Sequence, residues 1–276
     1  MNNIAINKIT NQIISDLEAG VISWDRPFLS GLPMNYTSGK KYNGINALVL
    51  GMSNFSNPYW LTFNQARQAG GQIKKGSKGT PIIFYKLNDY AKEKDNGELE
   101  LKTIPYMQYS TVFNYEQTKG LKDKFIKVKN NPIKTAELIA ENMQNKPKII
   151  PSNQPCYMPM SDQVGINSIN CFKSAQGYYS TLFHELGHST GHEDRLNRQS
   201  SDKTRNFGSE DYSKEELIAE FTSAFLCGQA GIIRDTRTNQ SAYIQSWLKA
   251  LKNDKSQLIK ASSQAQKAFN YITNLN

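Results

Sequence analysis

All three histidines of this 276-residue chain lie in one segment, HELGHSTGH, which runs from residue 184 to residue 192. His184 and His188 are four residues apart, and on a helix that spacing places two side chains on one face, about 5–6 Å apart at Cβ. Two imidazoles so placed can bind one tetrahedral zinc ion, with Glu185 as general base. The segment therefore predicts a helix over 174–189 with a divalent-metal site, Zn2+ being the expected ion and another divalent metal the alternative.

The surroundings of the segment favour a metal site over a surface helix with incidental histidines. The residues before it are largely apolar and aromatic, as expected of a helix that packs against a core. A glycine stands at position 187, and the rest of the chain contains no histidine. Confinement of all three histidines to one segment favours a shared role there, namely metal binding.

The third metal ligand is a separate question, because the sequence offers several candidates. His192 is next on the helix phase, although a glycine is expected to end the helix before it, and Asp194 completes the spacing HExxHxxGxxD. Downstream, Glu216 and Glu220 share one face of an otherwise apolar helix, where acidic side chains need a partner. We favour Glu216 as the ligand and Glu220 as a carboxylate that orients a ligand histidine. Glu220, Asp194 and His192 remain alternatives for the ligand.

The positive charge of the chain is unevenly distributed. The net charge is +9, and residues 1–134 hold 18 Lys and Arg against 10 Asp and Glu, whereas residues 135–276 hold 15 against 14. A basic first half beside a nearly neutral second half favours a polyanion-binding domain in the first half. An inert basic surface is the alternative.

The remaining composition argues for a cytosolic protein. No stretch approaches the roughly 18 apolar residues of a membrane span, so we expect no membrane association. The first 20 residues lack the basic start, continuous apolar run and cleavage site of a signal peptide. Three cysteines without CxxC spacing favour reduced, buried thiols over disulfides.

Helices combine with strand–turn–strand segments rather than with regular βαβ units, which predicts an α+β fold of two domains. In the first half we expect a helix over 4–19, a helix that begins after Thr62 as its N-cap and ends at Gly70-Gly71, a strand, basic turn and strand over 72–86, a loose hairpin tip or loop over 89–103 and a strand over 106–115. In the second half we expect helices over 135–144, 174–189 and 213–227, short strands at 149–150 and 157–160, a polar loop over 199–211 and a helical tail from 241. A basic connector places the boundary near residue 131, which gives domains 1–131 and 132–276.

At this point the chain resembles the ArdC-type antirestriction proteins, which conjugative plasmids and other mobile elements carry. The resemblance covers almost the whole chain. It rests on Trp24 and Pro27, on NYTSGKKYNGINALVL (35–50), PYWLTFNQARQAGGQIKKGSKGTPIIFYK (58–86) and TVFNYEQTKGL (111–121), and on HELGHSTGHEDRLNR (184–198), EELIAEFTSAFLC (215–227) and YIQSWLKALKND (243–254). Each segment is moderately specific, and their order and spacing make the match strong.

The resemblance implies an N-terminal domain that binds single-stranded DNA without sequence preference. It also implies a C-terminal metallopeptidase-like domain of zincin fold. Members of the family shield incoming DNA from restriction in a recipient cell. The expected partners are therefore single-stranded DNA and a protein substrate bound on that DNA.

The first half contains the lysines and aromatic rings that hold single strands elsewhere. The lysines cluster on two glycine-bearing turns, at Lys40 and Lys41 and at Lys74, Lys75 and Lys78. The candidate stacking rings are Trp24, Tyr36, Tyr42 and Trp60, of which Tyr42 and Trp60 are expected to contact DNA. The alternative for each ring is a place in the core.

Two functions from different classes follow. In the first, the protein is a zinc metallopeptidase in which Glu185 deprotonates the attacking water, and DNA binding brings it to its substrate. In the second, the protein coats DNA and its metal site is structural or vestigial. A strand over 156–167 lies upstream of the metal helix, either as a docking edge for an extended peptide or as a simple sheet edge.

Overall fold

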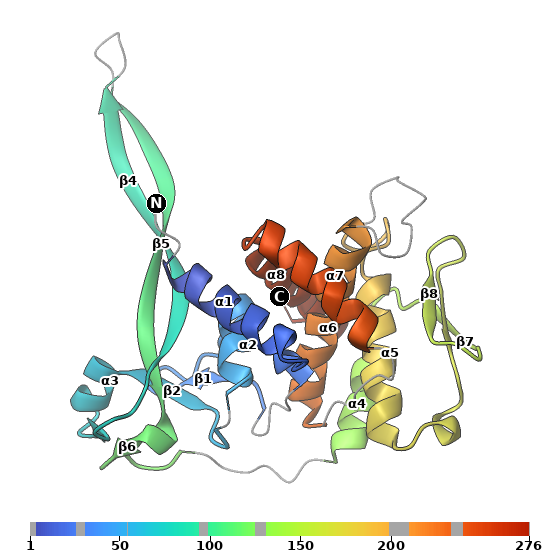
Figure 1. Ribbon diagram of the computed structural model, residues 1–276, viewed down its shortest axis with the longest axis horizontal. Coiled ribbons are helices and arrows are strands. Elements are labelled where there is room, and N and C mark those ends of the chain that lie inside the picture. The colour runs from blue at the N-terminus through green and yellow to red at the C-terminus, as the bar shows by residue number, and fades with distance from the viewer. Residues whose placement is uncertain are drawn as a thin grey trace.

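The computed structural model describes residues 4–25, 31–53, 55–93, 99–124, 131–198, 210–232 and 240–275. Figure 1 shows a long two-stranded hairpin that projects from a body built mainly of helices. Within the described residues, no helix has both the length and the apolar character needed to cross a membrane.

The first half combines a four-stranded sheet with short helices. The sheet has the order β1-β2-β5-β4, with β1 (Met34–Asn35) parallel to β2 (Tyr59–Thr62) and the other pairs antiparallel. Strands β4 (Thr80–Glu93) and β5 (Leu99–Asn114) form the long hairpin, and β3 (Gln72–Ile73) pairs with β6 (Thr118–Lys119). The helices are α1 (Ile4–Glu18), α2 (Gly44–Gly51) and α3 (Phe63–Gln68), with 3-10 turns at Ser23–Asp25 and Tyr115–Gln117.

The signals that begin and end α3 act as predicted. The Thr62 side chain accepts a hydrogen bond from the backbone N–H of Gln65, and the Gln65 side chain accepts one from the N–H of Thr62. This reciprocal capping box satisfies two N–H groups at the helix start. Gly70 follows the helix with φ +82°, a conformation that favours glycine.

The prediction of a loose tip or loop over 89–103 is wrong for most of that segment. The ladder of β4 and β5 continues without a break from Thr80 opposite Val112 to Glu93 opposite Leu99. Five of the charged residues that suggested a loop lie in the ladder, at positions 89, 92, 93, 100 and 102, with Lys92 directly opposite Glu100. The tip itself, residues 94–98, is outside the described residues. Charge density alone is therefore a poor sign of a loop.

The described part of the second half contains five helices and a small sheet that lies beside α5 (Figure 1). The helices are α4 (Pro132–Glu141), α5 (Ala175–Ser189), α6 (Glu210–Ala230), α7 (Gln240–Asn253) and α8 (Gln257–Thr273), and a 3-10 turn spans Ile169–Cys171. The sheet has the order β7-β9-β8, with β7 at Lys148–Pro151, β8 at Cys156–Met158 and β9 at Gln163–Ile166. Ser174 caps α5, and the predicted helical tail is confirmed as two helices. The predicted polar loop falls mostly at 199–209, outside the described residues.

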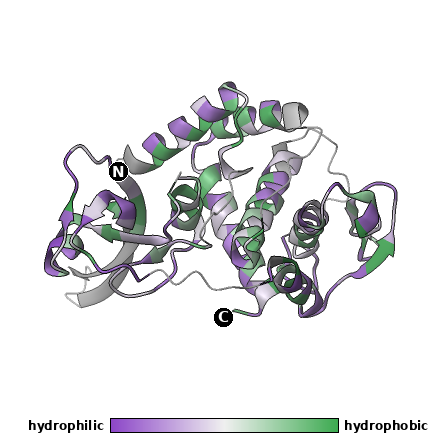
Figure 2. Cartoon of the chain, turned by 90° about the horizontal axis from the view of Figure 1, so that it is seen from below, coloured by the Kyte–Doolittle hydropathy of each residue, from purple (hydrophilic) through white to green (hydrophobic). Residues whose placement is uncertain are grey.

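Among the described residues, the largest of three apolar clusters joins the two halves. It combines residues of α1 and α2 with residues of α5, α6, α7 and α8. In Figure 2 hydrophobic and hydrophilic stretches interleave along the helices, as expected of helices that bury one face. The domain boundary near residue 131 stays a prediction. No disulfide joins the three cysteines, although only Cys227 is buried, so the expectation of uniformly buried thiols is wrong.

Candidate metal centre

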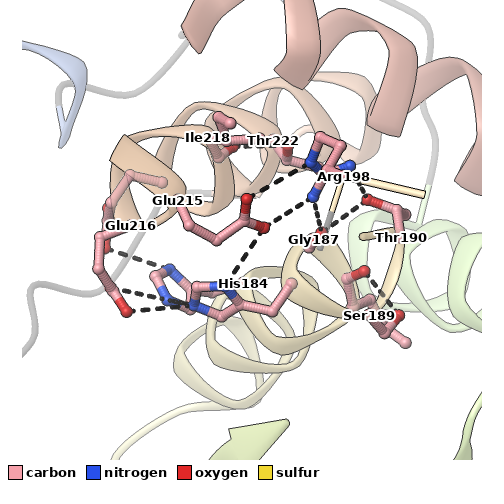
Figure 3. Close-up of polar contacts among 12 residues, drawn as sticks. His184, Gly187, Ser189, Thr190, Arg198, Glu215, Glu216, Ile218 and Thr222 are labelled. Carbon is pink, nitrogen blue, oxygen red and sulfur yellow. Dashed lines mark hydrogen bonds and ion pairs between the residues drawn. The ribbon is translucent and has the colours of Figure 1, made fainter. Parts of the chain in front are cut away.

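Helices α5 and α6 bring two histidines and a glutamate to one point. The Nε2 atoms of His184 and His188 are 3.0 Å apart. Glu216 lies opposite them, with one carboxylate oxygen 3.4 Å from His184 Nε2 and the other 3.3 Å from His188 Nε2 (Figure 3). The three donor atoms lie within 4.8 Å of one another, close enough to share a metal ion.

A glycine allows the two helices to approach this closely. A Cβ atom at Gly187 would lie 3.2 Å from Ala219 Cα and 3.3 Å from Thr222 Cβ, both on α6. Backbone atoms cannot move aside as a flexible side chain can, so a larger residue would push the helices apart. The glycine at the fourth position of HELGH therefore sets the distance between the histidines and Glu216.

Carboxylates also approach the outer nitrogens of both imidazoles. Glu220 Oε1 is 3.2 Å from His184 Nδ1, although the direction of this contact is poor for a hydrogen bond. Glu215 Oε1 is 3.8 Å from His188 Nδ1. Such contacts orient a metal-binding histidine and select its tautomer. Glu220 thus lies where the sequence places an orienting carboxylate.

Glu215 and Arg198 are a pair that sequence reasoning did not single out. Arg198 donates to Glu215 Oε1 at 2.8 Å, to the Thr190 hydroxyl at 2.7 Å and to the Gly187 carbonyl at 3.0 Å. Figure 3 shows the guanidinium between Glu215 and the end of α5. Both residues belong to the segments that carry the family resemblance, but nothing in their spacing places an arginine at residue 198 beside a glutamate at residue 215.

The buried charges of the site control one another. Burial disfavours the charged form of His188, but Glu216 and Glu215 outweigh burial and raise the pKa of His188 to about 10. Burial likewise favours the neutral form of Glu216, yet the two histidines hold the pKa of Glu216 below its usual range. The pKa of Glu215 is lowered to about 2, because His188 and Arg198 outweigh burial. The site therefore favours ionised carboxylates beside a positive charge, and a metal cation can supply that charge in place of the proton.

Glu185 is buried beside the cluster. It follows His184 on α5, and its charge contributes to the raised pKa of His188. Burial and, secondarily, the charge of Glu185 raise the pKa of the Cys156 thiol on β8. Because β8 is an edge strand of its sheet, an unpaired strand edge lies near Glu185.

The donor set fits a divalent metal. Among the described residues, the cluster offers two imidazoles and one carboxylate, the three-ligand set used by catalytic zinc sites that keep a fourth position for water or substrate. His192 and Asp194, the alternative ligands, lie outside the cluster and contact one another, with 3.5 Å between His192 Nδ1 and Asp194 Oδ2.

The structure divides the residues expected to contact DNA into two groups. All five lysines, at positions 40, 41, 74, 75 and 78, are exposed. Lys41 donates to Gln229 Oε1 on α6, and Lys74 donates to the carbonyl of Glu116. These two bonds hold the lysine side chains in place and leave other N–H donors on each ammonium group.

Most of the expected stacking rings are buried. Trp60 is only 1% exposed and packs edge-on against Phe55, and Trp24 and Tyr36 are also in the core. The prediction that Trp60 stacks on DNA is therefore wrong, because its ring has no open face. Tyr42 is half-buried, and its hydroxyl accepts a hydrogen bond from the Asn35 amide.

Other rings, which sequence reasoning missed, are open to solvent. Phe63 is 58% exposed and Tyr109 is 59% exposed. Exposure depends on packing between distant segments, so the sequence held no signal that separates these rings from the buried ones.

Fold and site together define a protein in which a basic N-terminal domain is followed along the chain by a zincin-like metallopeptidase domain. Residues 134–264 match the family model described as a zincin-like metallopeptidase, and residues 4–113 match the family model of the N-terminal domain of the anti-restriction factor ArdC. The chain belongs to the ArdC family of antirestriction proteins.

Solved structures and sequence relatives agree with this assignment. The metal-free crystal structure of the antirestriction ArdC protein from plasmid R388 is 34% identical, with a TM-score of 0.80 over 99% of this chain and 97% of that one. The Mn(II)-bound structure of the same protein gives a TM-score of 0.76 over 98% of this chain. Protein y4eC of Sinorhizobium fredii is 30% identical over 96% of this chain and 90% of its own length.

A DNA primase also contains a region similar to this chain. DNA primase TraC of Escherichia coli is 34% identical over 285 residues, which cover 96% of this chain and 26% of TraC. A second TraC protein of the same species is matched over 19% of its length. The chain thus spans about a quarter or less of these relatives.

Proposed function

We propose that this protein protects DNA entering a recipient cell from restriction. The R388 relative, which is named an antirestriction protein, supports the proposal. In this proposal the first half binds single-stranded DNA in the cytosol of the recipient, and the second half is a zinc metallopeptidase that acts on proteins bound to that DNA. The observation that carries the enzymatic part is the cluster of His184, His188 and Glu216, with Glu185 buried beside it.

The residues divide the chemical work as follows. His184, His188 and Glu216 would hold the metal, and Glu220 and Glu215 orient the two imidazoles. When bound, the metal polarises a peptide carbonyl and acidifies water. Glu185 accepts a proton from the attacking water at its carboxylate and passes it to the leaving amine. The edge of β8 offers N–H and C=O groups for an extended peptide.

The charge distribution supports the DNA-binding part. The lysines of the two turns are exposed, and the first half carries nearly all of the excess positive charge. Lysines that contact phosphates release counterions, so the affinity must fall as salt rises. We expect tighter binding of single than of double strands in a filter-binding comparison at two salt concentrations. Equal affinity for both, or no loss with salt, would refute single-strand binding.

The peptidase is tested by Glu185→Gln in a conjugation assay against a restricting recipient. The substitution keeps the shape of the side chain and removes its ability to accept a proton. We expect protection to fall to the level of a strain without the protein, while metal content by mass spectrometry stays at the wild-type value. Glu193→Gln, an exposed position on the same segment, is the matched control.

The alternative function predicts a different result in the same assay. A protein that only coats DNA retains full protection with Glu185→Gln, but loses protection when the lysines of both turns are changed to alanine. Metal content also decides the ion. One equivalent of zinc per chain supports the assignment of zinc. Manganese is the ion in the metal-bound structure of the R388 relative, and one equivalent of it in place of zinc refutes the assignment of zinc.

A further inference from the structure

A cavity of about 160 Å3 lies where the two halves of the chain meet. One wall consists of residues just after the first glycine-bearing turn, among them Lys41, Tyr42 and Asn43. The opposite wall comes mainly from α8 and includes Gln266, Phe269 and Asn270. None of the described residues that line the cavity is acidic, so an anionic ligand meets no repulsion there.

The lining combines the two kinds of groups that bind nucleobases in other proteins. Aromatic rings offer a face on which any of the four bases can stack, so such binding does not depend on the DNA sequence. Primary amides each present a carbonyl acceptor and an N–H donor pair, which match the edges of unpaired bases. Three amides and three rings line this cavity. Phe225 and Phe269 are only 1% and 3% exposed, so among these rings the half-buried one of Tyr42 is available to stack on a base.

The side chain of Asn43 is not used by the helix that it precedes. Asn43 is the N-cap residue of α2, a position where asparagine usually accepts a hydrogen bond from the helix backbone. Here it makes no such bond. Asn43 differs in this from Thr62, which caps α3 fully, and its amide is not engaged in capping α2.

The amides on the opposite wall are held in fixed orientation. Gln266 Oε1 accepts from the backbone N–H of Gly44 at 2.9 Å, which ties α8 to the start of α2. Gln266 Nε2 donates to Asn270 Oδ1 at 2.8 Å, so the Asn270 amide presents its N–H donors elsewhere. A ligand that enters the cavity therefore meets polar groups that are already ordered, which lowers the entropic cost of binding.

Positive charge lies beside the cavity. Lys41 lines it, and Lys40 is the exposed neighbour in the turn. The turn is fixed by Asn35 Oδ1, which accepts from the N–H groups of Thr37 and Ser38 at 3.0 and 2.9 Å. A phosphate attached to a base in the cavity would therefore lie next to two lysines on a rigid turn.

We propose that this cavity takes one nucleobase of single-stranded DNA, with the adjoining phosphate at Lys40 and Lys41. The inference rests on the proposed binding of single-stranded DNA and locates part of it. It also places the strand against α6, because Phe225 lines the cavity and Lys41 bonds to Gln229. The helix that holds Glu216 and Glu220 thus forms part of the DNA site.

The test compares a thymidine oligonucleotide with an abasic strand of the same length, by fluorescence anisotropy. For the wild-type protein we expect the abasic strand to bind about tenfold more weakly, since one base is lost from its stacking site. Asn43→Phe fills the cavity and should abolish this preference, and Asn43→Ala should reduce it without a change in thermal stability. Asn170→Ala, an exposed asparagine outside the cavity, should behave as wild type.

The outcomes separate this inference from the proposed function. No binding of either strand by the wild-type protein refutes single-strand binding, and this inference with it. Two results would refute the nucleobase site in the cavity but leave single-strand binding intact. One is strong, salt-dependent binding that is equal for the two strands, and the other is a preference for the thymidine strand that persists in both Asn43 variants. Thymidine monophosphate provides a further test. If it binds the wild type but not Asn43→Phe, and oligonucleotide binding is the same for both proteins, the cavity binds a free nucleotide rather than DNA. That result also overturns the proposal.

Discussion

The indole of Trp24 packs edge-on against the ring of Phe221, with 5.1 Å between the ring centroids. Trp24 belongs to the basic first half of the chain, whereas Phe221 follows Glu220 on the helix that faces the metal histidines. The same indole also contacts Trp247 on α7, at 5.2 Å. The first half therefore supports the helix on which part of the metal site is built.

Trp24→Ala should destabilise the whole protein, because it leaves a cavity at the junction of the halves. Loss of a buried tryptophan typically costs about 3–5 kcal/mol of unfolding free energy. Urea unfolding followed by circular dichroism measures the change. Trp24→Phe keeps an aromatic ring at the site and should cost less. Equal stability of the wild type and the alanine variant would contradict a shared core.

Gly187→Ala should weaken metal binding through the distance between α5 and α6. The new Cβ would meet the backbone of Ala219, and overpacking of this kind costs about 1–3 kcal/mol of stability. Because the histidines and Glu216 are on different helices, we expect metal affinity, measured by competition with a chelating dye, to fall as well. Thr181→Ala, on the same helix, is the control. A variant with wild-type affinity would show that the helix spacing is not critical.

Glu215→Gln should lower metal affinity although Glu215 is outside the proposed ligand set. It removes the negative charge that Arg198 and His188 share. Loss of such an outer partner typically lowers metal affinity about 10–100-fold. Arg198→Ala should act in the same direction, and Glu193→Gln should have no effect. Titration of the metal-free variants with metal measures the affinity. Unchanged affinity in both Glu215→Gln and Arg198→Ala would show that Glu215 and Arg198 serve only helix packing.

The ion pair of Asp162 and Arg195 should stabilise the protein in a pH-dependent manner. The Arg195 guanidinium holds the pKa of Asp162 below its usual value of 3.8, so the folded state binds a proton less readily than the unfolded chain. The stabilisation is therefore complete above pH 3.8 and is lost as the pH falls below it. Asp162→Asn should be less stable than wild type at pH 7, and the gap should narrow in acid. A gap independent of pH would contradict the ionic origin.

Several parts of this protein were readable from local patterns. The i, i+4 spacing of His184 and His188 puts both imidazoles on one helix face, whatever the rest of the chain does. The capping box at Thr62 and the basic first half were equally visible, and the family assignment rested on whole segments. These features could be predicted because each depends on the order and spacing of residues that are close together in the sequence.

Only the tertiary structure decided which distant groups meet. Glu216 rather than Asp194 or His192 lies with the two histidines, because α6 packs across Gly187. Arg198 reaches Glu215, and Trp60 is buried, because of the same kind of packing. Periodicity determines which face of an element is apolar, but contacts between elements depend on how those faces fit together, and that fit is a property of the whole chain.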